Sequence, residues 1–303
     1  MVKDETVQHE TGAFRNIIFT SEVQLRMMMT SPVLFMDGTF KSVPKNFEQV
    51  YIVNGAYRGE NFPLAFCIMT KRTSAAYRDF LRTLKLKAQE LAPNGLSPER
   101  IISDFEPAVM GPIAEFFPRS VHSGCWFHYC QALRRFVQTN QLLGEFEEHE
   151  NFRTNFYLKL CLPMLPSDKI IDANEIIDAN FQAPQRFREY FESYWEPKAT
   201  QISTFDFIET RTNNASEGYN SQFNKNVNFS KSNFWAFINK LRGEESYALF
   251  RKIKLDQGNP PIAMKLKYIT RNNNLSQWKN DFEAEQNHDL LFELQKVNHI
   301  IRN

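Results

Sequence analysis

Runs of apolar residues in the first third of the chain predict a group of β-strands. The run 33–36 is the clearest, since four consecutive apolar residues follow Pro32 and end at Asp37. An unbroken apolar run of this length is typical of a strand in a sheet that helices cover on both faces. Turn residues bound two further runs, 48–56 and 62–70, which complete a predicted meander of three strands.

Helical periodicity follows the meander. Apolar residues in 74–92 recur every three or four positions, with arginines and lysines between them. The next predicted elements are a strand over 101–103, a helix over 107–117, a short strand over 120–123 and a helix over 125–138. The order β-β-β-α-β-α-β-α predicts an α/β fold with an RNase H-like core, in which helices flank a mixed sheet.

The pattern also predicts how the chain divides. After the predicted core, prolines separate helical pieces and strand periodicity disappears. We divide the chain into a polar lead-in with a short helix (1–31), the RNase H-like core (32–139), an all-α insertion (140–208), a helical return (209–255) and a C-terminal tail (256–303). The tail is expected to be loop-like, with weak helices.

Two of the predicted strands end at an aspartate, Asp37 and Asp104. Ligands of helix-covered sheets gather at strand ends, so adjacent strands would bring these carboxylates together. Two carboxylates at such a short distance repel each other unless they share a proton or a cation. Each also has an ordinary interpretation, because Asp37-Gly38 is a common turn pair. Glu106, beside Asp104, fits a helix-start acid that the helix dipole stabilises.

Glu217 is a candidate third carboxylate. Tyr219, Phe223 and Val227 repeat every four residues and predict the buried face of a helix. Glu217 follows Asn214 by three residues, which fits a capping box, and spacing alone favours this capping role. The alternative is that the helix delivers Glu217 to the aspartate pair.

Three carboxylates suit a particular chemistry. Mg²⁺ and Mn²⁺ prefer oxygen ligands and keep some of their water. Two such ions, held ~4 Å apart, can activate the attacking oxygen and stabilise the leaving oxygen of a phosphodiester. The residue types of Asp37, Asp104 and Glu217 therefore predict a two-metal site.

Composition narrows the classes of function. Because the net charge is only +1, any DNA contact would have to come from a local basic patch. The most basic stretch of the chain is 231–254. A core helix with a solvated charged face is the commoner explanation of that stretch. Four cysteines in 303 residues indicate reduced, intracellular thiols. No signal peptide, glycine-rich phosphate loop or apolar run approaching the ~18 residues of a membrane span is present.

Cys125 and His128 form a second constellation. Cys-x2-His is half of a zinc site, and no second half follows at a recognisable spacing. A buried cysteine and a hydrogen-bonded histidine at a helix start are the more ordinary reading of this spacing. Zinc is therefore a weakly supported cofactor.

Four segments, taken in order, resemble the catalytic domain of Mutator-like element (MULE) transposases. They are Asp37-Gly38-Thr39-Phe40-Lys41 with Pro44, Ser103-Asp104-Phe105-Glu106-x-Ala108, Cys125-x2-His128 and Asn213-Asn214-x2-Glu217-Gly218. The similarity covers roughly 33–241, and the segment from Asn233 to Ile238 also looks like the family's sequence after the glutamate.

The resemblance implies an RNase H-like core with an α-helical insertion between the second aspartate and the glutamate. It implies a DDE site in which Asp37, Asp104 and Glu217 bind Mg²⁺ or Mn²⁺, cut DNA at transposon ends and join it to a target. Cys125 and His128 would be the family's Cys-x2-His pair, with a structural role. Nuclear localisation and a homo-oligomer on paired ends are implied as well. Under this resemblance Glu217 is a metal ligand rather than only a cap.

The chain departs from the family in one respect. Relatives commonly carry an N-terminal zinc finger that recognises element ends, and no Cys/His cluster precedes residue 32. A fragment of a longer protein and a host protein derived from a transposon are both consistent with this. The alternative function is a transposon-derived, non-catalytic module that binds DNA or protein in the nucleus. A helix-rich interaction protein, whose acids are only caps and turns, is the third hypothesis.

Overall fold

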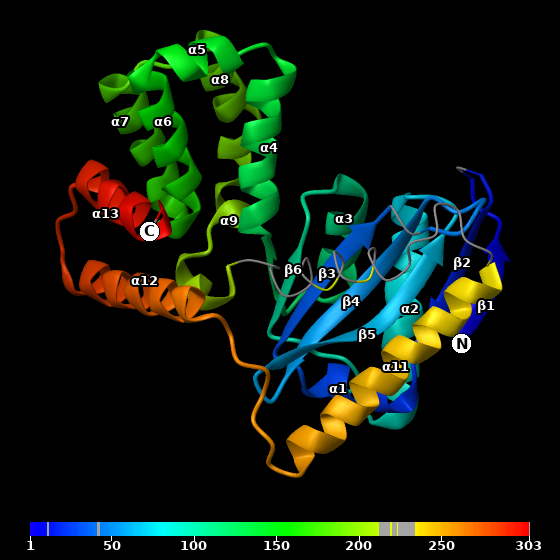
Figure 1. Ribbon diagram of the computed structural model, residues 1–303. Helices are drawn as coiled ribbons and strands as arrows, with labels where there is room; N and C mark the ends of the chain where they lie inside the picture. Colours follow the sequence, from blue (N-terminus) through cyan, green and yellow to red (C-terminus); the bar gives the residue numbers. More distant parts are fainter. Residues whose placement is uncertain (11, 41–42, 212–218, 220–222, 224–233, 303) are drawn as a thin grey trace. The chain divides into compact units, whose positions relative to one another are not determined.

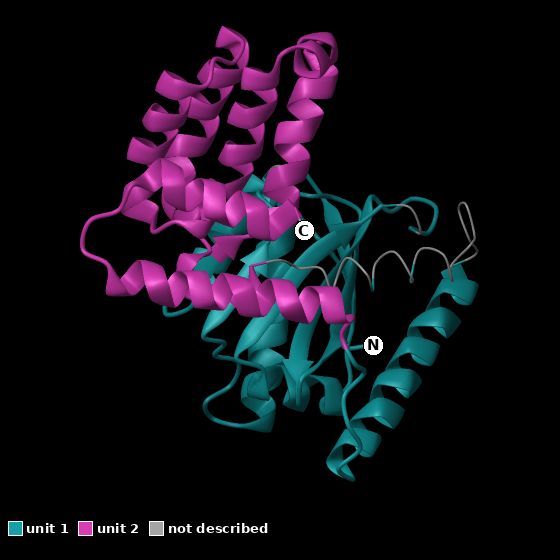
Figure 2. Ribbon diagram, turned by 60° about the vertical axis from the view of Figure 1, so that its left-hand side comes forward, with its two compact units in different colours: residues 1–122, 213–263 teal, residues 123–212, 264–303 magenta. Residues whose placement is uncertain are grey.

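The computed structural model describes residues 1–10, 12–40, 43–211, 219, 223 and 234–302. The chain divides into two compact units, each assembled from two stretches of sequence (Figures 1 and 2). Unit 1 consists of residues 1–122 and 213–263, and unit 2 of residues 123–212 and 264–303. The domain boundaries expected from the sequence stay a prediction.

Within the described residues, unit 1 is organised on a sheet of seven strands in the order β1-β2-β5-β4-β3-β6-β7. The strands are β1 (Lys3–Val7), β2 (Phe14–Phe19), β3 (Val33–Thr39), β4 (Gln49–Tyr57), β5 (Glu60–Met69), β6 (Arg100–Ser103) and β7 (Val121–Gly124), the last of which ends across the unit boundary. The meander β3-β4-β5 is antiparallel and β6 runs parallel to β3. The predicted α/β class with a mixed sheet is confirmed.

The hairpin β1–β2 extends the sheet beyond the meander and was not predicted. Its strands pair antiparallel, and β2 then pairs with β5. The side chain of Lys3 contacts Asp79, which is buried in the second helix of the unit, at 2.5 Å. That helix holds the edge strand through an ion pair, although the strand itself is polar.

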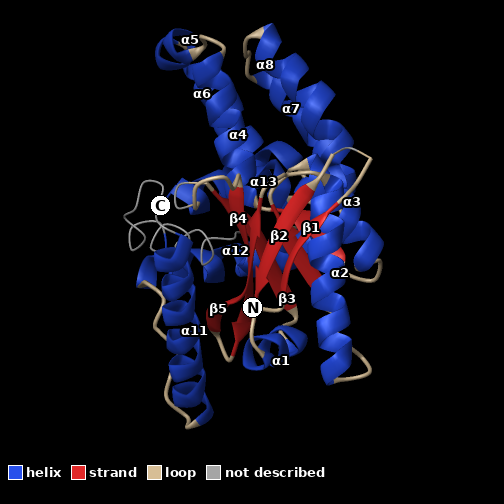
Figure 3. Cartoon of the chain, turned by 90° about the vertical axis from the view of Figure 1, so that its right-hand side faces the viewer, coloured by secondary structure: helices blue, strands red, loops and turns tan. Residues whose placement is uncertain are grey.

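Helices cover both faces of the sheet in unit 1 (Figure 3). One face carries α1 (Glu22–Thr30), α2 (Ser74–Leu91) and α3 (Pro107–Phe116), and the other carries the first half of α11 (Phe234–Asp256). The start of α1 is a capping box, because Ser21 and Gln24 exchange side-chain and backbone hydrogen bonds. Residues on α2 bury one stripe, as the predicted periodicity requires.

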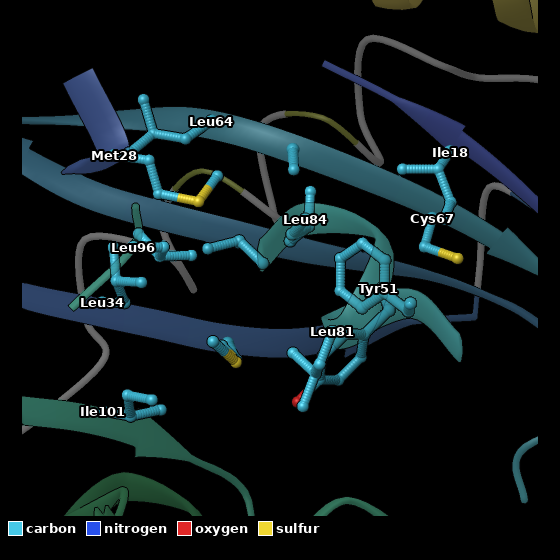
Figure 4. Close-up of a cluster of buried hydrophobic side chains, with 14 of the residues drawn as sticks. Ile18, Met28, Leu34, Tyr51, Leu64, Cys67, Leu81, Leu84, Leu96 and Ile101 are labelled. Atoms are coloured by element: carbon cyan, nitrogen blue, oxygen red, sulfur yellow. The ribbon is translucent and has the colours of Figure 1, made fainter. Parts of the chain in front are cut away.

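Alternation along β4 separates the core into two clusters. Tyr51 and Val53 face α1 and α2, in the cluster drawn in Figure 4 with Leu34, Leu81 and Ile101. Their neighbours on the strand face the opposite side, where the rings of α11 pack; they are Val50 and Ile52. This second cluster matters for the site, because one of the candidate acids belongs to the same face.

Unit 2 is helical over its described residues. Its helices are α4 (Trp126–Thr139), α5 (Leu143–Glu148), α6 (Glu150–Cys161), α7 (Ile170–Asn180), α8 (Gln185–Tyr190), α9 (Ala199–Ile202), α12 (Leu266–Ala284) and α13 (Leu290–Arg302), joined by short 3₁₀ and π turns. Helix α13 packs against α6 and α7. None of the described helices is both long enough and apolar enough to cross a lipid bilayer.

The C-terminal region differs from the loop-like tail that we expected, since it forms the long helices α12 and α13. The physical reason is that α12 buries only three side chains, Leu275, Trp278 and Phe282, and is otherwise polar. Three buried positions in nineteen residues give a weak periodic signal, so tertiary packing decides the helix.

Candidate metal site at the ends of two parallel strands

Asp37 and Asp104 occupy equivalent positions on adjacent parallel strands. The register of β3 and β6 pairs Leu34 with Ile101 and Met36 with Ser103, and each aspartate is the next residue of its chain. Neighbouring strands lie ~4.8 Å apart, so the two carboxylates meet at the same edge of the sheet. The structure thus brings together the two acids that the sequence placed at strand ends.

Asp37 is a buried carboxylate, with 6% of its surface exposed. Its Oδ1 accepts a hydrogen bond of 2.8 Å from the backbone N–H of Gly38. In the antiparallel ladder it lies directly opposite Ile52, so both side chains belong to the sheet face on which α11 packs. The Asp37-Gly38 pair lies inside β3 rather than in a turn.

Asp104 carries the clearest electrostatic signature of the site. Its pKa is raised to about 7, first by burial and then by the negative charges of Asp37 and Glu106. The backbone N–H of Glu106, 3.3 Å from Oδ1, and the charge of Arg72 oppose the rise. Burial and two neighbouring carboxylates therefore disfavour the ionised form of Asp104.

Glu106 belongs to a chain of hydrogen bonds beside the aspartates. It occupies the N-cap position of α3, as expected of a helix-start acid, but its side chain makes no capping bond. Instead its Oε2 accepts from Arg72 at 2.8 Å and from the Tyr77 hydroxyl at 3.0 Å. Tyr77 in turn accepts from the Gln49 amide at 2.7 Å. Glu106 is thereby paired with a cation and held in place.

The side chain of Tyr51 lies on the sheet face opposite to that of Asp37. It is fully buried, and its hydroxyl has no hydrogen-bond partner among the described residues. Burial raises the pKa of Tyr51 far above its usual value, and the negative charges of Asp104 and Asp37 raise it further. The phenol therefore stays protonated.

Ser103 and His122 support Asp104 from behind. The Ser103 hydroxyl donates to the carbonyl oxygen of Asp104 at 2.8 Å, and Nε2 of His122 lies 2.8 Å from Oγ of Ser103. Burial lowers the pKa of His122 to about 4, so the ring is neutral near pH 7. The Ser103 hydroxyl has one proton and donates it to the Asp104 carbonyl. Its oxygen can therefore only accept from His122, which fits a ring that donates from Nε2. Sequence analysis gave His122 no role.

Glu217, with Asn213 and Asn214, lies outside the described residues. The two described residues that follow it, Tyr219 and Phe223, are helical, in agreement with the predicted periodicity. The Phe223 ring is 1% exposed and lies 6.1 Å from Phe66 and 5.9 Å from Phe237. This packing fixes Phe223 on the sheet face that carries Asp37.

Cys125 and His128 lie at the start of α4 in unit 2, at its N-cap and in its first turn. The Cys125 thiol is buried, as are the other three cysteines. Burial also raises the pKa of the Cys130 thiol well above its usual value. Among the residues that the structure describes, no group of three histidine, cysteine or acidic side chains is placed to hold a metal ion.

The basic stretch expected around 231–254 is largely paired where it is described. Arg251 binds Glu60 at 2.7 Å, Lys240 binds Glu244 at 2.7 Å and Lys252 binds Asp256 at 2.5 Å. Phe237 and Leu241 of the same helix are buried. A core helix with a charged outer face describes α11 better than a continuous DNA-binding surface does.

Comparison with known families matches residues 33–132 to the MULE transposase domain. The matched range begins at β3 and ends within α4, so it contains Asp37, Asp104, Cys125 and His128 and stops before Glu217. None of the curated proteins compared with the chain matches it.

Proposed function

We propose, on the premise that residues 33–132 are a Mutator-like transposase domain, that the chain cuts and joins DNA by a metal-dependent DDE reaction on an RNase H-like core. The observation that carries the proposal is the position of Asp37 and Asp104, one residue beyond a register pair of parallel strands. The family match and the paired acids are independent, since one comes from sequence and the other from strand register.

The donor set fits a hard divalent cation. Asp37 and Asp104 offer carboxylate oxygens from two rigid strands, which is the ligand chemistry that Mg²⁺ and Mn²⁺ prefer. The raised pKa of Asp104 records repulsion that a bound cation would relieve. Asp37 and Asp104 would hold the ions, and Glu106 is committed to Arg72 and Tyr77.

Glu217 is the proposed third ligand. Tyr219 follows it by two residues and belongs with Phe223 to the aromatic cluster on the face of Asp37. The packing of Phe223 supports a role for Glu217 in metal binding beyond helix capping.

When bound, Mg²⁺ or Mn²⁺ supplies activation of the attacking oxygen and stabilisation of the negative charge that develops on the phosphate. The residues of the chain position these events. Asp37 is fixed by the Gly38 amide, and Asp104 is supported through Ser103 and His122. Positioning of this kind is what phosphoryl transfer chiefly demands of a protein.

Metal binding is the first test, because it needs no knowledge of the DNA sequence. We expect calorimetry to detect Mn²⁺ binding by the wild-type chain and its loss in Asp37→Asn and Asp104→Asn. Glu115→Gln is the matched control, since Glu115 lies on α3 in the same unit with its side chain 50% exposed and paired to Arg78. Undiminished binding by both aspartate variants would reject the assignment of the acids.

Cleavage is the second test. A duplex library incubated with the chain and Mn²⁺ should yield cut ends, and Asp37→Asn, Asp104→Asn and Glu217→Gln should each reduce the rate by orders of magnitude. Folding of each variant is checked by its far-UV circular dichroism.

The proposal includes action on paired DNA ends by a homo-oligomer in the nucleus. Equal cleavage by Glu217→Gln would remove Glu217 from the metal ligands and leave it a cap.

A further inference from the structure

An aromatic ring and a guanidinium face each other just beyond the end of β3. Phe40 is the first residue after β3, three positions beyond Asp37, and 51% of its surface is exposed. The guanidinium carbon of Arg72 lies 4.7 Å from the centre of the Phe40 ring. Arg72 comes from the short loop between β5 and α2, far from Phe40 in sequence.

The position of Arg72 is fixed by its ion pair with Glu106. One terminal nitrogen donates to Glu106 at 2.8 Å, and Glu106 is itself held by Tyr77 and by its place at the start of α3. The carboxylate raises the pKa of Arg72, so the side chain stays charged. A guanidinium has five N–H donors in a planar fork, and the bond to Glu106 occupies one nitrogen. The Arg72 side chain is 39% exposed.

A surface cation over an aromatic ring is common and is worth little by itself. What distinguishes this pair is its neighbourhood. The ring belongs to the residue that follows β3, three positions beyond Asp37. Arg72 binds Glu106, whose backbone N–H donates to Oδ1 of Asp104 at 3.3 Å. A large exposed aromatic next to a group of acids has no evident structural purpose, because burying it would stabilise the fold.

Resting on the DNA-cutting function proposed above, we propose that Phe40 and Arg72 form a nucleotide subsite for an unpaired base next to the phosphate that is cut. The base stacks on the ring or the guanidinium plane, and a phosphate oxygen accepts from the exposed N–H groups of Arg72. Aromatic rings bind unpaired bases in this way without regard to sequence. A base stacked inside a duplex is out of reach of a side chain so close to the acids.

The substrate class follows from this geometry. The chain should prefer DNA whose end carries unpaired nucleotides over a fully paired blunt duplex. Charge complementarity supports the choice, because Arg72 is a cation held by Glu106, next to Asp104, and an acidic site without such a cation would repel phosphate. The subsite would therefore contribute both affinity and the placement of the strand.

The test compares two DNA probes of the same sequence, one blunt and one with a three-nucleotide unpaired 3′ end that contains 2-aminopurine. Ca²⁺ replaces Mg²⁺ so that binding is measured without rapid cleavage. We expect the wild-type chain to bind the unpaired end more tightly and to quench the 2-aminopurine emission as the base stacks. Phe40→Ala should lose the quenching and bind this probe roughly tenfold more weakly, with blunt-duplex affinity unchanged.

Two matched controls are available within unit 1. Phe250 is an exposed phenylalanine of α11, 54% exposed, so Phe250→Ala removes an equally exposed ring away from the acids. Arg78 pairs with Glu115 at 2.6 Å and has a side chain 47% exposed, which makes Arg78→Gln the control for Arg72→Gln. Only the Phe40 and Arg72 variants should reduce binding of the unpaired end.

The outcomes separate the two proposals. Wild-type DNA binding with no effect of Phe40→Ala would overturn the subsite and leave the DNA-cutting function standing. An equal loss on both probes would make Phe40 a duplex contact, which also overturns the subsite. Failure of the wild-type chain to bind either probe, with or without Ca²⁺, would overturn both proposals together.

Discussion

The Oγ atom of Ser103 lies 2.8 Å from Nε2 of His122, on the residue that immediately precedes Asp104. The Ser103 hydroxyl donates to the Asp104 carbonyl, so the histidine on β7 supports the backbone of the acid that directly follows β6. His122 touches no proposed ligand and is best described as a positioning residue. Its effect on the site should therefore depend on whether a replacement keeps the donor.

We expect His122→Ala to weaken Mn²⁺ binding by roughly tenfold, as loss of an outer partner of a metal ligand typically does. His122→Gln should retain most of the affinity, because the glutamine Nε2 can supply the same donor to Ser103. Calorimetry at pH 7.5 measures both variants. A merely structural role would lower the melting temperature of the two variants alike and leave their Mn²⁺ affinities equal.

Asp104→Asn should stabilise the metal-free protein. The pKa of Asp104 is about 7 in the folded chain, above its unfolded value, so ionising it costs stability as pH rises from about 4 to 7. Removing the carboxylate recovers on the order of 1–3 kcal/mol at pH 8 and little at pH 4. Urea unfolding at the two pH values checks this, with Glu115→Gln as the control. A pH-independent effect would contradict the raised pKa.

The affinity for Mn²⁺ should also depend on the ionisation of Asp104. It should rise with pH, whereas the stability of the metal-free protein falls. Below pH 7 a proton competes with the cation for Asp104. Mn²⁺ affinity should fall by roughly tenfold or more between pH 7.5 and 5.5. Calorimetric titrations in buffers of different ionisation enthalpy should also record proton release on binding near pH 6.5. Constant affinity over this range would exclude Asp104 as the ligand.

Gly38→Ala should disturb the hydrogen-bonded chain beside the site. An added Cβ would lie 2.7 Å from Oε1 of Gln49, a fully buried side chain that is bonded to Tyr77. We expect a loss of about 1–2 kcal/mol in unfolding free energy. Gly243→Ala is the control, because nothing lies within 4 Å of the added atom on α11 and alanine favours the helix. Equal stabilities for the two variants would contradict the crowding argument.

Unit 2 offers a test of buried charge. Lys159 is fully buried and its ammonium binds Asp178 at 2.9 Å as well as Asn174. Lys159→Met leaves Asp178 without its cation and should cost about 3–5 kcal/mol, whereas Lys159→Met with Asp178→Leu should recover much of that loss. Breaking the surface pair Lys279–Glu283 should cost under about 1 kcal/mol. Urea unfolding compares the three; a loss for Lys159→Met no larger than the surface value would refute the argument.

Sequence patterns were sufficient where a single element carries the information. The meander, the long helix from Ser74 and the acids at two strand ends follow from local periodicity, and the predicted limits of that helix agree with the structure to one residue. Local patterns fail for the edge strand β1, whose five residues are mostly polar because they border solvent. They fail again for α12, which buries little.

The parts of the site that sequence could not provide are contacts between distant elements. Arg72 and Glu106 meet because the β5–α2 loop and the start of α3 adjoin, and Ser103 and His122 meet across neighbouring strands. No spacing rule connects residues whose proximity depends on strand order. The DG and SD motifs located the acids, but not the side chains that hold them.

The interleaving of the two units bears on how the chain is made. Helix α11 covers one sheet face of unit 1, and α13 packs against α6 and α7 in unit 2. Each core is therefore completed by residues from 234 onwards. On a ribosome, both cores would remain open until α11 and α13 have left the exit tunnel. The acids of the site would then acquire their final surroundings only after α11 has packed on the sheet, which makes the site a late product of folding.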